Sequence, residues 1–235
     1  STVIISSSAI AKTLRNGGLE RVLDPAEGHV RLELIIDSVS KSYGARRVLH
    51  DVTARAGTGQ VLVIAGPNGS GKSTLVRMVA RLTRPTDGRV LWKLDGRALP
   101  ATDIRRAIGM VSPDLTLYDE LSAAENLRFF AQVRGLSATP EFVRSLLDRF
   151  GLGGRGGDLV RAYSSGMKQR LKYAFALMHD PPLLILDEPT ANLDERGVAL
   201  VHDTIAQARL RKCVVMATNE PEEVRLGDVV IQLGA

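Results

Sequence analysis

Residues 66–73 read Gly66-Pro67-Asn68-Gly69-Ser70-Gly71-Lys72-Ser73, and Thr74 follows. This run fits the pattern G-x-x-x-x-G-K-[ST] of a phosphate-binding loop. The apolar residues of the segment 60–65 predict a buried strand before the loop, and the spacing within residues 72–81 predicts a helix after it. An ordinary glycine-rich turn needs neither the lysine nor the serine. We therefore expect this stretch to bind the phosphates of a nucleotide.

Each part of the loop has a chemical role in holding phosphate. Glycines let backbone N–H groups close around phosphate oxygens, where a Cβ would clash. The N-terminus of the following helix adds a partial positive charge. We expect Lys72 to reach the β- and γ-phosphates of ATP and the Ser73 hydroxyl to bind Mg²⁺. The residues predicted to contact the phosphates are Gly66, Pro67, Asn68, Gly69, Ser70, Gly71, Lys72, Ser73 and Thr74.

A second motif consists of four apolar residues, 183–186, followed by Asp187 and Glu188. The apolar run predicts a central buried strand. Asp187 at its end can bind Mg²⁺ through water. Glu188 can then polarise a water aimed at the γ-phosphate, as a catalytic residue. A plain buried strand ending in solvated acids would look the same, but the phosphate loop favours the metal-binding interpretation.

A third segment reads Tyr163-Ser164-Ser165-Gly166-Met167 and precedes a predicted helix. A serine and small residues at a helix N-terminus can form a second phosphate site. Ser164 could equally be a helix cap and nothing more.

The order of these three motifs resembles the nucleotide-binding subunits of ABC transporters. The signature of that family usually reads Leu-Ser-Gly-Gly-Gln, and the variant here is similar to the branch of polysaccharide, drug and lipid exporters. The chain is also similar to compact exporter subunits such as the haem-exporter ATPase. The resemblance implies that Ser164, Ser165 and Gly166 close over the nucleotide of a second subunit. It also implies that Tyr43 stacks on adenine.

Two positions depart from the family. Pro113 stands where the family has a glutamine, and proline offers no side-chain oxygen to Mg²⁺ and no backbone donor. A shift of one residue would place the carboxylate of Asp114 there instead. Asn219 stands where the family has a histidine; its amide can donate a hydrogen bond to phosphate but cannot carry a positive charge. We expect nucleotide binding to persist, whereas the hydrolysis rate depends on these replacements.

Apolar strands alternate with helices along the chain, which predicts a largely parallel sheet covered on both faces. The expected fold is an α/β P-loop NTPase with a mostly parallel core sheet, an N-terminal antiparallel β part and an inserted helical subdomain at about 114–163. Residues 1–30 are predicted to be an extension or linker, and residues 31–235 the ATP-binding domain.

Composition narrows the function classes. Aromatic residues make up 4% of the chain, so a stacking platform for single-stranded nucleic acid is not expected, although the net charge is +5. The single cysteine, Cys213, permits no internal disulfide, which fits a reducing compartment. Neither a signal peptide nor an apolar run long enough to span a membrane is visible. We expect a cytoplasmic protein, peripheral on the cytoplasmic face of a membrane, with its permease on a separate chain.

The motifs and the two departures are compatible with three functions. The first is an ATP-binding subunit that hydrolyses Mg-ATP at a dimer interface and drives export through a separate permease. The second is a catalytically weak or inactive subunit, paired with the same or a homologous chain, which binds ATP as a clamp or switch. The third is a soluble ABC ATPase acting on DNA or ribosomes, which ranks last because the usual coiled-coil insert or second ATPase domain is absent. The sequence names neither the cargo nor its direction.

Overall fold

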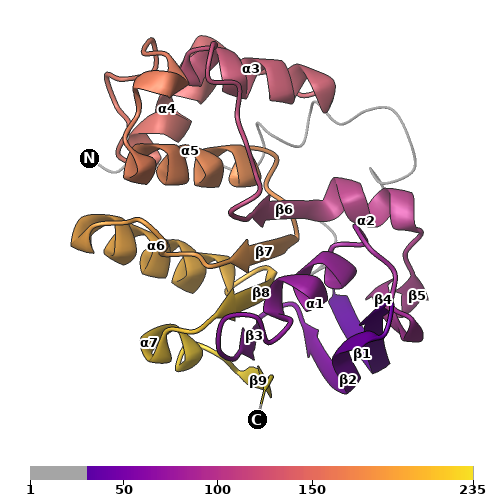
Figure 1. Ribbon diagram of the computed structural model, residues 1–235. Helices are drawn as coiled ribbons and strands as arrows, with labels where there is room; N and C mark the ends of the chain where they lie inside the picture. Colours follow the sequence, from indigo (N-terminus) through magenta and orange to yellow (C-terminus); the bar gives the residue numbers. More distant parts are fainter. Residues whose placement is uncertain (1–30, 235) are drawn as a thin grey trace.

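The computed structural model describes residues 31–234 (Figure 1). The segment 1–30, predicted to be an extension or linker, lies outside the described residues. Two sheets form the framework. The antiparallel sheet has the strand order β2 (Arg46–Gly57), β1 (Leu32–Tyr43), β4 (Asp87–Leu94) and β5 (Arg97–Ala98). The parallel sheet has the order β6 (Ile108–Val111), β7 (Leu183–Asp187), β8 (Cys213–Thr218), β3 (Val61–Ala65) and β9 (Val229–Gln232).

Helices connect and cover these strands, and the predicted α/β fold is confirmed. The helices are α1 (Lys72–Val79), α2 (Ala101–Ala107), α3 (Ala123–Val133), α4 (Pro140–Arg149), α5 (Ser165–Leu177), α6 (Glu195–Ala208) and α7 (Pro221–Val224). A short 3₁₀ helix, Val160–Ala162, precedes α5. In Figure 1, α3, α4 and α5 gather at one end of the molecule, away from the antiparallel sheet.

Strand β3, which lies between β8 and β9, shows how the core is divided. Val61 and Val63 face one hydrophobic cluster, in which the parallel sheet meets the helical end of the molecule. Leu62 and Ile64 face a second cluster, shared with α1 and the antiparallel sheet. Trp92 of β4 connects the antiparallel sheet to α1, because its indole N–H donates to the Val79 carbonyl oxygen at 3.0 Å. Helix α1, which follows the phosphate loop, is thus held between the two sheets.

Polar caps start the helices of the inserted region and its neighbours. Ser122 and Glu125 form a capping box at the start of α3. Thr139 caps α4, Ser164 caps α5 and Asp194 caps α6, each through a side-chain oxygen that accepts a backbone N–H.

Four elements differ from the sequence expectations. The sequence patterns of 32–36 and 39–43 each predict a separate strand, but β1 is one strand whose register shifts between Ile36 and Val39, as in a β-bulge. Ser38 at this bulge has a positive φ of 51°. Helices α2 and α7 and the short strand β5 were not expected. Each spans at most two helical turns or two residues, too little for a periodic pattern.

Candidate functional site

The glycine loop between β3 and α1 has backbone geometry that only glycine adopts easily. Gly71 caps α1 with a φ of 102°, and a Cβ there would lie 2.9 Å from the Leu49 side chain. Gly66 has a φ of 154°, and a Cβ there would lie 2.5 Å from the Leu233 carbonyl oxygen. The loop is therefore packed between β2 on one side and the end of β9 on the other.

The side chain of Lys72, the first residue of α1, contacts the backbone of this loop. Its side chain is 5% exposed, and its ammonium donates to the Gly66 and Pro67 carbonyl oxygens at 2.8 and 3.0 Å. An ammonium has three N–H donors, so one remains for a phosphate oxygen. The Ser70 hydroxyl is buried with no partner among the described residues. Both groups are placed to bind an anion inside the loop.

A cavity of about 340 Å³ lies over the loop. Its lining residues are Arg46, Val48, Asn68, Gly69, Gly71, Lys72, Ser73, Thr74 and Glu188. Arg46 and Val48 were not foreseen. They belong to β2, whose strand pattern was visible in the sequence, but only its pairing with β1 carries them over the loop. The cavity brings the predicted phosphate loop and the predicted catalytic acid to one place.

Asp187, at the end of β7, lies beside this cavity and is 4% exposed. Burial raises the pKa of its carboxyl above the ordinary value; the nearby Glu188 acts in the same direction, and a hydrogen bond from Ser73 opposes the shift. Its Oδ1 is buried and has no partner among the described residues. A buried carboxylate oxygen beside a serine hydroxyl fits Mg²⁺, which binds one or two protein oxygens and takes its other ligands from phosphate and water.

Glu188 lines the cavity in an unusual backbone conformation. Its φ is 52°, a left-handed value that is uncommon for a residue with a Cβ. Its backbone N–H donates to the Ala217 carbonyl of β8 at 3.0 Å. The conformation turns the chain sharply at the end of β7 and directs the carboxylate towards the cavity.

The signature segment, residues 163–167, does not line this cavity. The Ser164 hydroxyl accepts the Met167 N–H at 3.2 Å, so the helix-cap role is realised. Ser164 and Ser165 are exposed. A Cβ at Gly166 would lie 3.2 Å from the Asn192 carbonyl oxygen, so Gly166 packs on the segment that follows Glu188.

Tyr43, predicted to stack on adenine, ends β1 and is 52% exposed. It does not line the cavity, but it lies opposite Arg46, which does. The Lys41 ammonium lies 5.1 Å from the centre of its ring.

The two departures from the family lie outside the cavity lining. The Lys172 ammonium of α5 donates to the carbonyl oxygens of Ser112 and Pro113 at 3.1 and 3.2 Å. Asp114 pairs with Arg77 of α1 at the surface. Asn219, just after β8, is exposed.

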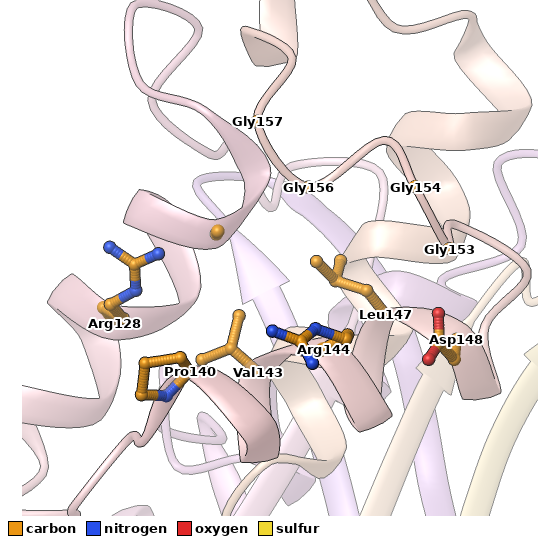
Figure 2. A pocket seen from close by; sticks show the side chains of 11 residues that line it. Arg128, Pro140, Val143, Arg144, Leu147, Asp148, Gly153, Gly154, Gly156 and Gly157 are labelled. Atoms are coloured by element: carbon orange, nitrogen blue, oxygen red, sulfur yellow. The ribbon is translucent and has the colours of Figure 1, made fainter.

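A second hollow of similar size lies between α3, α4 and the glycine-rich loop after α4 (Figure 2). Arg128 and Arg144 project towards it from the two helices. None of the residues of the three motifs lines it, so its chemistry is separate from the phosphate loop.

Comparison with known proteins identifies the family and the fold of the chain. Residues 49–191, more than half of the chain, match the family described as ABC transporter. The chain is an ABC transporter ATP-binding domain. It is 38% identical to a daunorubicin resistance ATP-binding protein of Streptomyces coeruleorubidus, over 73% of this chain and 55% of that protein. It is 35% identical to a lantibiotic transport ATP-binding protein of Streptococcus pyogenes, over 79% of both chains.

Solved ABC structures match as well. An ATP-binding subunit of an ABC transporter superposes with a TM-score of 0.74 at 29% identity, covering 85% of each chain. A dimeric ATP-binding cassette in a post-hydrolysis state, bound to ADP and Pi, gives a TM-score of 0.75 at 26% identity. That match covers 85% of this chain and 94% of the other. Within residues 31–234, every helix is too short or too polar to cross a membrane.

Proposed function

We propose that this ABC domain binds Mg-ATP over its phosphate loop and hydrolyses it at the interface of a dimer, driving export through a separate permease. The observation that carries the proposal is the cavity, which gathers the loop, Lys72, Ser73 and Glu188 beside the unpaired Oδ1 of Asp187. These are the groups that phosphoryl transfer to water requires.

The residues divide the chemistry between them. The loop amides and the remaining N–H of Lys72 hold phosphate oxygens and keep the γ-phosphate in position. Ser73 and Asp187 hold Mg²⁺, which when bound neutralises charge on the β- and γ-phosphates. The Glu188 carboxylate accepts a hydrogen bond from the attacking water and orients it. Tyr43 stacks on the adenine ring.

The dimer is needed because the signature has no phosphate within its own subunit. Ser164, Ser165 and Gly166 are away from the cavity, and Ser164 and Ser165 are exposed, so they are free to cover a second subunit's nucleotide. The solved relative with ADP and Pi is dimeric, which supports this arrangement.

A trapping experiment tests the dimer. Glu188→Gln keeps the shape of the side chain but removes the charge that orients water, so ATP should stay bound and hold two subunits together. We expect an ATP-dependent dimer by light scattering or native mass spectrometry. Glu195→Gln, at an exposed acid on α6, is the matched control and should behave as wild type. A Glu188→Gln variant that stays monomeric at saturating ATP, with and without its membrane partner, would refute the proposal.

The export role and the location at the cytoplasmic face of a membrane rest on relatives whose names include drug resistance and lantibiotic transport. Co-purification of a multi-pass membrane protein with the chain would support transport. Co-purification of nucleic acid would instead favour a soluble ABC ATPase.

A second candidate is a slow subunit that uses ATP as a clamp or switch. Two observations favour it: the Pro113 carbonyl accepts from Lys172, and Asn219 does not line the cavity. In such a slow subunit the groups that bind nucleotide are intact, and only the rate of ATP hydrolysis is reduced.

A further inference from the structure

The backbone of Glu188 is strained, and the structure around it must hold it in place. Left-handed conformations are unfavourable in residues with a Cβ and persist only where neighbouring contacts fix them. The N–H of Glu188 is fixed by Ala217 on β8. The two residues that follow, Pro189 and Thr190, are fixed by side chains from two other elements.

Side chains of helix α5 form hydrogen bonds with Pro189. The Tyr173 hydroxyl donates to the Pro189 carbonyl oxygen at 2.9 Å, and the Gln169 amide approaches the same oxygen at 3.3 Å. Both side chains are buried. They lie on the helix whose N-terminus carries the signature, so the signature helix is tied to the segment after Glu188 within the same subunit.

A side chain of helix α7 forms a hydrogen bond with Thr190. The Thr190 hydroxyl donates to Glu223 Oε1 at 2.5 Å. Glu223 is 2% exposed, and its Oε2 is buried with no partner among residues 31–234. No salt bridge within the described residues includes Glu223. Burial raises the pKa of the Tyr173 hydroxyl, and the nearby Glu223 raises it further.

A buried carboxylate with one hydrogen bond is costly for the fold. A neutral or apolar side chain at position 223 of this four-residue helix would cost less free energy to bury. What Glu223 provides in return is an acceptor for the hydroxyl of Thr190, two residues after the catalytic acid. It also connects that segment to α7, which begins two residues after Asn219.

We propose that Glu223 is a positioning residue for Glu188 and acts through the Thr190 hydroxyl. This inference rests on the proposed hydrolysis of ATP at Glu188. Glu223 does not line the cavity; it fixes the segment whose strained start directs the Glu188 carboxylate into the cavity. Loss of the pair lets Glu188 relax from its left-handed conformation. Turnover then falls, while the phosphate loop still binds nucleotide.

The pair is tested by variants that keep or remove one hydrogen bond. Thr190→Val is isosteric and removes the donor, and Glu223→Met removes the acceptor. Each should lower kcat by about 10- to 100-fold, because small displacements of a catalytic group cost rate on this scale. Nucleotide affinity should be unchanged. Thr190→Ser and Glu223→Gln keep a donor and an acceptor and should retain most of the turnover.

Controls separate positioning from general stability. Glu222→Met, at the exposed neighbour on α7, should leave kcat unchanged. The double variant Thr190→Val/Glu223→Met should be no slower than either single variant, because both remove the same interaction. Equal losses in Thr190→Val and Thr190→Ser, a matching loss of affinity, or full turnover in Thr190→Val would each overturn the proposal.

A readout that does not depend on turnover keeps the two proposals distinct. Hydrogen exchange of residues 188–193 should be faster in Thr190→Val than in wild type or Thr190→Ser, with the rest of the chain unchanged. Unchanged exchange in this segment would refute the positioning role. A wild-type chain without ATPase activity, even with its membrane partner, would count against the proposed function, and the exchange measurement would still decide the pair.

Discussion

The phosphate loop and the two segments that follow β6 and β8 are all at the carboxyl ends of parallel strands, yet they are built differently. The loop is buried under β2 and the end of β9, and Lys72 is held within it. The segments with Pro113 and Asn219 lie outside the cavity, and Asp114 and Asn219 are exposed. Lys172 and Arg77 hold the first of them at the surface.

This contrast separates binding from hydrolysis. The groups proposed to bind phosphate are held in place by the packing of the loop and by the hydrogen bonds of Lys72. We propose that turnover depends instead on the positions of Pro113 and Asn219, where the resemblance to the family predicts a glutamine and a histidine. The nucleotide affinity of this chain and its turnover are therefore expected to respond to different substitutions.

The substitution Asn219→His tests the difference between nucleotide binding and hydrolysis most directly. An imidazole at this position can donate a charge-assisted hydrogen bond to the γ-phosphate, and donors of this kind are worth on the order of a hundredfold in rate. We expect turnover to rise by about this factor at unchanged nucleotide affinity, with both measured on the same preparation. Asn219→Gln, which keeps an amide, should show no rise. A fast wild-type rate that Asn219→His does not alter would show that asparagine suffices.

A smaller effect is expected at Tyr43, on the binding side of the contrast. The ring is half exposed, so its stacking on adenine should be worth about 1 kcal/mol, the lower end for base–aromatic pairs. Tyr43→Ala should weaken nucleotide binding accordingly in a titration with a fluorescent ATP analogue. Tyr43→Phe should be close to neutral. Equal losses in the two variants would point to the hydroxyl and not to the ring.

The smallest effect concerns the far end of β6, the strand that leads to Pro113. His179 lies after α5, and its Nε2–H donates to the Ile108 carbonyl oxygen at 3.1 Å. Burial, and then the charge of Arg134, lower its pKa from the ordinary 6.5 to about 3; Lys212 acts in the same direction, and the Ile108 bond and Asp180 oppose it. The unfolded chain therefore binds a proton between these values that the folded chain does not.

The sign of the pH effect follows from this difference. The stabilisation is present above pH 6.5 and is lost as the pH falls towards the folded pKa. Between pH 7 and pH 6 this one histidine should lower the free energy of unfolding by about 0.7 kcal/mol. Denaturant titrations of His179→Gln should lack this increment, whereas the exposed control His50→Gln should keep it. An identical pH slope in wild type and His179→Gln would rule out His179 as its source.

Local patterns predicted much of the fold. The apolar runs of β3, β7 and β8 and the glycine loop give clear local signals, and each of these strands lies where the sequence indicated. The roles assigned to the site residues stay predictions, although the loop, Lys72, Ser73 and Glu188 do line one cavity. What the sequence could not supply depends on tertiary contacts. Arg46 reaches the cavity only through strand pairing, and the Thr190–Glu223 bond joins residues 33 positions apart.

The place of β9 beside the phosphate loop has a consequence for how the molecule assembles. Strand β3 pairs with β8 on one side and β9 on the other, and the Leu233 N–H donates to Ala65 directly before the loop. Both neighbours lie far downstream of β3 in the chain. Such non-local pairing is slow, and β3 has two unpaired edges until it is complete. A growing chain thus carries its phosphate loop well before the two strands that flank β3 have been made.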